Sequence, residues 1–382
     1  MQLDFHYYAT YCAAFIAGYS HEESLVICYC AQFVDCCTRS FLAQIKAPLQ
    51  AATTQSATEL LDVNTDILGL QDITRIWASF HFLPGDLYAP VKALFKHYKN
   101  KYRLICAPDS DLVSRTVELA KGKDLHAAGV AMHVLADTWA HRNFAGTPSM
   151  VINNTDSYFF EIMPDGSERK IRFGHNPGAA DDIENGKYTN TIYNVSETTI
   201  MNLGHGRAGH LPDYSFIRYK YMPAWDNYRE CLKDNPAEYY KAFCQMVYAM
   251  RYLRGEEETF ETGRYDEGNV APWETRIKEI LTTRQTDSRA DWKALGEELS
   301  GEKIPDFDET HYVEEYRNAP KGKHYLTFLG KFIITALAQK SMVTNQIYKS
   351  GNRLAGVSVD YNKKGFGGMK DFKRLVKHIE GK

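Results

Sequence analysis

The chain of 382 residues is long enough to bury a large core, and 44% of its residues are hydrophobic. Its formal net charge of −3 argues against a protein that coats nucleic acid by general electrostatic attraction. The N-terminus lacks the pattern of a signal peptide, and no apolar stretch approaches the roughly 20 residues of a membrane span. These features predict a soluble, cytoplasmic protein without a transmembrane segment, whose eight cysteines are reduced core residues.

The first part of the chain predicts two helices. A short helix begins at Asp4 and ends near Gly18, because glycine is a common C-cap. Ser20 starts a capping box for a second helix over about residues 21–46. Asp35 interrupts the apolar run AQFVDCC of that helix, so its carboxylate needs a partner if it faces inward.

The segment that follows contains one unusual histidine. Residues 50–87 read as irregular and include His81 between two phenylalanines, just before the turn sequence LPG. Helices are then predicted over about 88–99 and 110–121. His81 stands out because it interrupts a strongly apolar context, where a histidine needs a partner.

A central helix is predicted over Leu125–Gly146, which is rich in Ala, Leu and Met. His126, His133, Asp137 and His141 lie within an arc of about 80° and share one face of it. Imidazoles that flank a carboxylate one helical turn away on each side are typical of a buried metal site. Surface helices also carry such i,i+4 pairs without any metal, so the helix alone leaves both interpretations open.

Residues 147–225 differ in composition from the helical segments before them. Gly, Asn, Pro and Asp are frequent, and short β-like pieces surround a good hairpin turn at Pro164. A long loop and β-hairpin excursion in a helical protein usually covers or builds a site. Its stretch GHGRAGHLPD contains G-x-G-x-x-G, but a proline follows where a helix should begin and no βαβ unit surrounds it, so we reject a dinucleotide site. His205, His210 and Asp213 in this stretch remain candidates for metal or phosphate binding.

The predicted fold class is all-α: a multi-helix bundle in which the excursion over about 147–225 folds back over a metal site. An amphipathic helix is predicted over 235–252, a long one over about 322–349 and a basic amphipathic one over 362–382. The expected organisation is a metal-binding helical core over 1–253 with the inserted excursion, a charged, peripheral helical insertion over 254–320, and C-terminal helices over 321–382 that pack on the core.

The candidate metal ligands come from separate helices and loops, as the ligands of enzyme metal sites usually do. They are His6, Asp35, His81, His133, Asp137, His141, His205 and His210, with Asp213 as a further carboxylate. A ferritin-like di-iron centre is disfavoured because no paired Glu-x-x-His motifs occur. Another metal hydrolase, such as an amidase, stays open.

This pattern resembles the superfamily of zinc-dependent phospholipase C and the fungal single-strand nucleases, which are all-helical and hold three zinc ions. A nearer resemblance is to an uncharacterised bacterial family of this type, with the motifs DFHYY, AQFVD, FHFLPG, HVLADTWAH and GHGRAGHLPD over roughly residues 1–250. Two departures from the superfamily stand out. The chain begins with Met1, where the phospholipases use a mature N-terminal Trp as a ligand, and His141 follows Asp137 more closely.

The resemblance implies a ligand set for each of three zinc ions. Asp35, His81 and His133 would hold the first, with Asp137 as a bridge to the second. The second would take His6, with Asp4 as a further candidate. The third would draw on His141 together with His205, His210 or Asp213.

The implied activity is zinc-dependent hydrolysis of phosphoesters by a metal-activated water, on a small phosphoester or nucleotide-like substrate. Asp4 or Asp213 would act as general base, and Arg207 or Arg142 would clamp a phosphate. The alternative is a non-catalytic helical protein with a structural metal site, which acts as a partner-binding module. A closed set of four ligands per metal would favour this alternative, and an open position would favour an enzyme.

Overall fold

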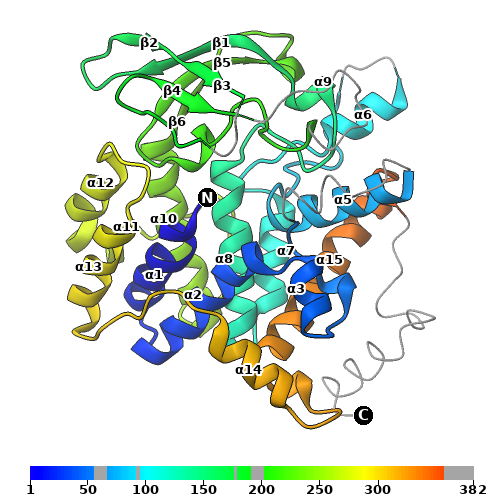
Figure 1. Cartoon of the computed structure of the whole chain (residues 1–382), viewed down its shortest axis with the longest axis vertical. Helices are drawn as coiled ribbons and strands as arrows, with labels where there is room; N and C mark the ends of the chain where they lie inside the picture. Colours follow the sequence, from blue (N-terminus) through cyan, green and yellow to red (C-terminus); the bar gives the residue numbers. More distant parts are fainter. Residues whose placement is uncertain (56–66, 92–94, 176–178, 191–201, 357–382) are drawn as a thin grey trace.

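The computed structural model describes residues 1–55, 67–91, 95–175, 179–190 and 202–356, and the predicted helix over 362–382 lies outside them. The described chain is mostly helical, with a small β-region at one end of a helical bundle (Figure 1). The helices and strands are numbered as in Figure 1.

Helix α8 (Leu125–Ala140) lies at the centre of the bundle, and every residue from His126 to Ala140 is buried. It packs against α2 (His21–Cys36), α7 (Asp111–Ala120), α10 (Asn235–Arg254) and α15 (Phe328–Lys349). Gly129 allows the closest of these contacts, because a side chain there would collide with the carbonyl oxygen of Ile27 on α2. Apart from the face that carries His133 and Asp137, its sequence is largely apolar, as expected of a helix that is buried on every side.

The N-terminal segment packs on α8 and ends in two short helices. It consists of η1 (Asp4–Ala9), α1 (Thr10–Ile16), α2, α3 (Arg39–Gln44) and η2 (Leu49–Ala51). The capping box at Ser20 is confirmed, but the single helix predicted over 21–46 is wrong. The chain leaves the helical conformation at Cys37, and the Thr38 hydroxyl accepts a hydrogen bond from the backbone of Phe41 to start α3.

The segment before α8 is more helical than predicted. Helix α5 (Ile67–Phe80) occupies a stretch that the sequence reading left irregular, and it ends directly before His81. Its apolar face packs against α15, so tertiary packing decides its structure. Helix α6 (Lys96–Tyr102) is shorter than the predicted 88–99, and Pro90 disfavours a helical Ala89, since the residue before a proline avoids the α conformation.

The excursion contains more β-structure than a single hairpin, so the all-α class is only roughly correct. A four-stranded antiparallel sheet has the order β2-β1-β5-β6, and β3 pairs with β4 in a separate two-stranded parallel sheet. The elements are α9 (Met150–Asn153), β1 (Thr155–Ile162), β2 (Glu168–Lys170), β3 (Arg172–Gly174), β4 (Lys187–Thr189), η4 (Leu211–Asp213), β5 (Arg218–Pro223), η5 (Ala224–Asp226) and β6 (Cys231–Asp234). The predicted turn near Pro164 does connect β1 to β2. An aromatic cluster fills the space between this β-region and the helices, and it includes Phe82, Phe144 and Tyr221.

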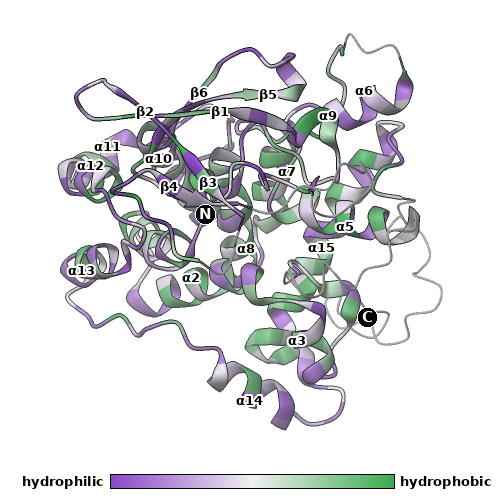
Figure 2. Cartoon of the chain, turned by 45° about the horizontal axis from the view of Figure 1, so that its top comes forward, coloured by the Kyte–Doolittle hydropathy of each residue, from purple (hydrophilic) through white to green (hydrophobic). Residues whose placement is uncertain are grey.

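The charged segment after α10 is packed into the bundle. Its elements are α11 (Glu267–Val270), η6 (Ala271–Trp273), α12 (Glu274–Thr282), α13 (Arg289–Ser300), α14 (Thr310–Asn318) and η7 (His324–Leu326). Helices α12 and α13 are hydrophilic over much of their ribbons (Figure 2). Their apolar faces nevertheless bury Trp292 and Leu295 against η1, α1 and α10. The segment is therefore not peripheral, because it completes the main core.

One contact of this segment fixes the start of the chain. The hydroxyl of Ser288 donates to the Asp4 carboxylate at 2.6 Å, and the Ser288 amide contacts the same oxygen at 3.4 Å. The Asp4 carboxylate also accepts from the amide of Phe5. Asp4 thus ties η1, which carries His6, to the N-terminal end of α13.

Two predictions about the chemical character of the chain can be compared with the structure. None of the described helices is both long and apolar enough to cross a lipid bilayer. All eight cysteines fall within the described ranges, and each of them is a free thiol. A cytoplasmic location stays a prediction.

Candidate metal centre

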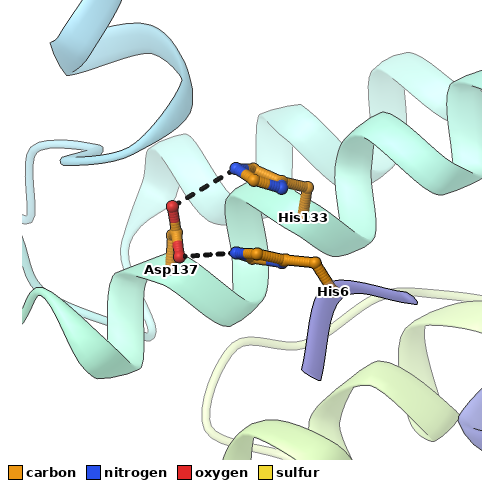
Figure 3. Close-up of side chains that lie close together, drawn as sticks. All are labelled: His6, His133 and Asp137. Carbon is orange, nitrogen blue, oxygen red and sulfur yellow. Dashed lines mark hydrogen bonds and ion pairs between the residues drawn. The ribbon is translucent and has the colours of Figure 1, made fainter. Parts of the chain in front are cut away.

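The structure brings His6, His133 and Asp137 together as a fully buried group, called group A here (Figure 3). His6 Nε2 lies 3.1 Å from Oδ1 of Asp137, and His133 Nε2 lies 3.3 Å from Oδ2. The two imidazoles stack with their ring centroids 3.8 Å apart. Two ring nitrogens therefore converge on the two oxygens of one buried carboxylate.

A second group, B, consists of Asp35, His81 and His133. Asp35 Oδ1 lies 3.8 Å from His81 Nδ1 and 3.9 Å from His133 Nε2. His81 Nδ1 also lies 3.0 Å from Oδ2 of Asp137. His133 thus belongs to both groups. The Asp35 side chain is 30% exposed, which gives this group a side that faces solvent.

A third group, C, consists of His141, His205 and Asp213. His141 Nε2 lies 3.2 Å from Oδ1 of Asp213, and His205 Nε2 lies 3.7 Å from Oδ2. In each of the three groups the potential ligand atoms lie within 4.8 Å of one another. The excursion after residue 147 therefore supplies His205 and Asp213, and the third member, His141, directly follows α8.

Asp137 connects the groups. Its Oδ2 lies 3.6 Å from Nδ1 of His141, in addition to its contacts within groups A and B. The amino nitrogen of Met1 lies 2.8 Å from Asp137 Oδ1 and 3.2 Å from Asp213 Oδ1. The two carboxylates raise the pKa of this amino group to about 11, although burial alone would lower it. A positive charge is thus held between Asp137 and Asp213.

Backbone carbonyls fix the orientation of three of the imidazoles. His81 Nε2 donates to the Thr53 carbonyl at 3.0 Å, and His141 Nδ1 donates to the His81 carbonyl at 2.6 Å. His205 Nδ1 donates to the Gly209 carbonyl at 2.7 Å. In each ring the second nitrogen then faces one of the groups. Histidines that ligate metals are usually held in this way.

The protonation states suit metal binding. Burial lowers the pKa of His133 to about 4, and it lowers the pKa of His205 to about 4 as well. Burial alone would raise the pKa of Asp137 and Asp213, but the Met1 amino group and neighbouring histidines hold both pKa values well below the usual range. Neutral imidazoles and ionised carboxylates are the forms that bind metals.

The loop that carries group C is held from several sides. The Asn235 amide donates to the carbonyls of Leu211 and Tyr214, both at distances below 3.0 Å, and the Tyr239 hydroxyl donates to the Pro212 carbonyl. Gly209 adopts a φ of +56° and lies so close to the Thr189 carbonyl that a side chain would collide with it. Gly209 thus allows the close approach of two backbones.

Aromatic rings cover the excursion side of group C. The Phe82 ring stacks on His141 with a centroid distance of 4.5 Å, and Phe144 meets His205 edge-on at 5.9 Å. Both phenylalanines are almost completely buried. They exclude water from this side and so strengthen the electrostatic interactions inside the site.

The C-terminal end of α8 is closed by a buried lysine. Lys233 on β6 donates to the carbonyls of Trp139 and Ala140 at 2.9 and 3.1 Å and pairs with the Glu238 carboxylate. A cation at this end of a helix satisfies its last carbonyls and complements its dipole. The contact fixes the turn after which His141 follows.

Four of the predicted residues have other surroundings. The His210 side chain is 53% exposed and contacts Asp213 at 3.6 Å, from the outer side of group C. The carboxylate of Asp4 binds Ser288 and Phe5, as described above, so a role as general base or ligand loses its support. Arg207 donates to the Thr155 carbonyl at 3.1 Å. Arg142 pairs with Glu238 at 3.4 Å, so its guanidinium serves the closure of α8.

A fifth residue, His126, shares the predicted face of α8 but not the site. It packs at the other end of the helix against Phe328 and contacts Asp124 at 3.4 Å. A position within the same arc of about 80° on the helix face therefore does not by itself identify a residue of the site.

Sequence reasoning missed the parts of the site that backbone atoms supply. The amino nitrogen of Met1 and the carbonyl of Thr53 contribute through groups that every residue possesses. No residue type marks such positions, so only the fold reveals them. The interruption of apolar sequence by Asp35 and His81, in contrast, was a usable signal.

Comparison with known proteins gives one match. A family described as "Family of unknown function (DUF6765)" matches residues 1–347. No curated protein and no solved structure matches the chain. The matched region contains groups A, B and C in full. On this evidence the chain belongs to the DUF6765 family.

Proposed function

We propose that the protein is a zinc-dependent hydrolase of phosphoesters. The observation that carries the proposal is the linkage of three histidine–carboxylate groups through His133 and Asp137. Separate structural metals need no shared ligands, whereas a cluster that acts on one substrate needs its metals close together. Nitrogen and carboxylate donors of this kind suit zinc, although other divalent metals accept them too.

The residues fit such a cluster. Asp137 and Asp213 are buried carboxylates that require positive charge nearby, and the Met1 amino group lies between them. Bound zinc would lower the pKa of a water molecule and neutralise charge on a phosphoryl group. Asp35 is the partly exposed member of group B and marks the side from which a substrate would approach.

The protein's own residues have distinct roles in this proposal. Asp137 would contribute its carboxylate to more than one metal, and His6, His133 and His81 lie around its two oxygens. Asp213 is the carboxylate of group C and lies 3.2 Å from the Met1 nitrogen, so it is the remaining candidate for general base. A clamp for phosphate by Arg207 stays a prediction, since its side chain has a backbone partner in this structure.

One observation favours the alternative of a structural metal. His6, His133 and Asp137 are buried to within 1% of their surface, which is typical of a closed site. In that case group A alone would bind a metal for stability, and the protein would act as a helical partner-binding module.

Substitution of Asp137 separates the two functions. Asp137→Asn keeps the size of the side chain but removes the charge that connects the groups, so bound metal should fall. Under the hydrolase proposal, cleavage of bis-p-nitrophenyl phosphate by the tag-free protein drops by orders of magnitude. The melting temperature then changes little, because a core of this size does not depend on metal as a zinc finger does.

Elemental analysis of the same two samples provides the control. Wild-type protein that carries zinc but cleaves no phosphoester, together with a variant that unfolds, would overturn the hydrolase proposal in favour of the structural one. Asp165→Asn, in the exposed turn between β1 and β2, should match the wild type in every measurement.

A further inference from the structure

Three basic side chains from three different helices gather on the side of the bundle that α3, α5 and α15 share (Figure 1). Arg39 lies on α3, Arg75 on α5 and Lys340 on α15. Asp72, also on α5, pairs with both arginines: Oδ2 contacts Arg39, and Oδ1 lies 3.7 Å from Nη1 of Arg75. We call these four residues the cation cluster. None of them belongs to group A, B or C.

Lys340 is the buried member of the cation cluster. Its side chain is only 7% exposed, and Nζ donates to the Ala52 carbonyl at 3.2 Å. An ammonium group has three N–H donors, so two of them lack an acceptor among the described residues. Burial, together with the charges of Arg75 and Arg39, lowers the pKa of Lys340. A buried cation in this position is costly unless a negative charge comes close to it.

The two arginines also have N–H groups that are not fully used. Arg39 Nε is buried and has no hydrogen-bond partner within the part of the chain that the structure describes. Arg75 Nε donates to the Ala355 carbonyl at 2.9 Å, which holds its guanidinium in place. The distance of 3.7 Å between Arg75 Nη1 and Asp72 is too long for a hydrogen bond. One carboxylate thus serves two guanidinium groups incompletely.

The charges of the cation cluster do not balance. Two guanidinium groups and one ammonium group face a single carboxylate, which leaves a local charge of +2 when Lys340 is protonated. The side chains of Arg39 and Arg75 are 43% and 30% exposed, whereas Lys340 is buried. An anion can therefore reach the cluster from the arginine side and approach the lysine behind it.

We propose that the cation cluster binds the dianion of a phosphate group. Guanidinium groups donate to phosphate oxygens in pairs, and a lysine adds a point charge. A dianion offsets the whole excess charge of the cluster, whereas chloride or a carboxylate would offset half of it. The tetrahedral arrangement of phosphate oxygens also offers acceptors to donors that come from three helices, such as Arg39 Nε and Lys340 Nζ.

The cation cluster is separate from the metal centre but shares a stretch of backbone with it. Lys340 donates to the Ala52 carbonyl, and the next carbonyl, that of Thr53, accepts from His81 of group B. A zinc cluster would also attract phosphate. The two positions must therefore be distinguished by variants, although binding at the cation cluster does not require a metal.

Isothermal titration calorimetry with inorganic phosphate tests the proposal. Tag-free, full-length protein should bind phosphate at constant ionic strength, and Lys340→Met should weaken this binding by about 10-fold or more, as expected when a hydrogen bond between charged groups is lost. Arg39→Gln should act in the same direction and serves as the second variant if Lys340→Met does not fold. Asp72→Asn should strengthen binding, because it removes the carboxylate that competes for both arginines.

Two further titrations identify the ligand and its position. Glycerol phosphate, compared with inorganic phosphate, shows whether the cluster prefers a phosphomonoester or the free ion. Repetition after EDTA treatment should give the same difference between wild type and Lys340→Met, because no metal takes part. A difference that disappears with the metal would assign phosphate to the metal centre and overturn the proposal.

Matched controls make the result decisive. Lys349→Met lies at the exposed end of α15, and Arg115→Gln removes an exposed arginine that pairs with Asp111 on α7. Both should bind phosphate as the wild type does, and circular dichroism checks that every variant is folded. Equal affinities of wild type, Lys340→Met and Arg39→Gln for both compounds would overturn the proposal. That result would leave the hydrolase proposal untouched, since its test measures metal content and phosphoester cleavage.

Discussion

His81 and His141 are joined by a hydrogen bond of 2.6 Å, from Nδ1 of His141 to the backbone carbonyl of His81. The His81 ring belongs to group B, while its carbonyl orients the His141 ring of group C. One residue therefore supports two groups by two different chemical functions. Only its role in group B depends on the imidazole, because the backbone carbonyl that orients His141 is present with any side chain.

His81→Ala should consequently remove metal from group B but leave group C intact. We expect the zinc content of the purified variant to fall by about one ion per chain, since His81 contributes the only imidazole of group B that group A does not share. Elemental analysis measures this loss. A complete loss of metal would contradict the separation of the two functions.

The two histidines of the GHGRAGHLPD motif should behave differently. His205 is a member of group C and is fixed by the Gly209 carbonyl, whereas His210 is half exposed on the outer side of Asp213. His205→Ala should weaken metal binding by about 10- to 100-fold or more, the range found when a metal-supporting residue is lost. His210→Ala serves as the matched control and should weaken metal binding much less.

Competition of both variants with a zinc chelator measures the affinities. If His210→Ala lost metal as readily as His205→Ala, group C would have to include His210, and the arrangement described above would be wrong.

Lys233 should be important for stability. Lys233→Met leaves Glu238 with only its contact to Arg142 and leaves the carbonyls of Trp139 and Ala140 unsatisfied. We expect a loss of about 3 kcal/mol, as for other buried pairs that lose one partner. Urea unfolding measures it. Lys170→Met, an exposed lysine on strand β2, should change stability by less than about 0.5 kcal/mol.

The buried Lys340 predicts a pH dependence of stability. Burial, together with nearby Arg75 and Arg39, lowers the pKa of Lys340 to about 7, and its side-chain nitrogen donates to the Ala52 carbonyl. Between pH 7 and about 10.5 the unfolded chain binds a proton here that the folded chain does not. The contribution of Lys340 to the free energy of unfolding therefore rises with pH across that window and is lowest below the window.

Lys340→Met should remove this penalty. We expect the variant to be about 1–4 kcal/mol more stable than wild type at pH 7, with a difference that shrinks towards pH 10. Denaturant midpoints at the two pH values measure the change. Lys349→Met, an exposed position at the end of the same helix, is the control. A variant less stable than wild type at pH 7 would show that Lys340 is charged and paired.

The sequence predicted the helical core well but the β-region poorly, and the reason differs for each. The apolar pattern around His133 and Asp137 identified α8 because a buried helix is set by local composition. The strands are short and their pairing depends on residues far apart, such as Tyr219 opposite Lys233. Helix α5 was missed although its sequence is amphipathic, and its apolar face packs on α15.

The same distinction applies to the candidate site. Asp35, His81 and His133 stood out as polar residues in apolar surroundings, and the structure places them together. Asp4 showed the limit of this reasoning. It lies two residues from His6, yet its carboxylate contacts Ser288. Sequence proximity to a ligand does not show which way a side chain faces, because neighbouring residues on a helix point in different directions.

The bond between Asp4 and Ser288 has a consequence for the order in which the site is completed during synthesis. A chain emerges from the ribosome with its N-terminus first, so His6 is made early, but the contacts of its helix η1 with α13 can form only after α13 has followed. Asp35, His81 and His133 are all present by the middle of the chain, and Asp213 comes later. A nascent chain would therefore acquire its groups in the order B, C and A, and an ion captured early would meet group B before Asp137 is closed in by His6.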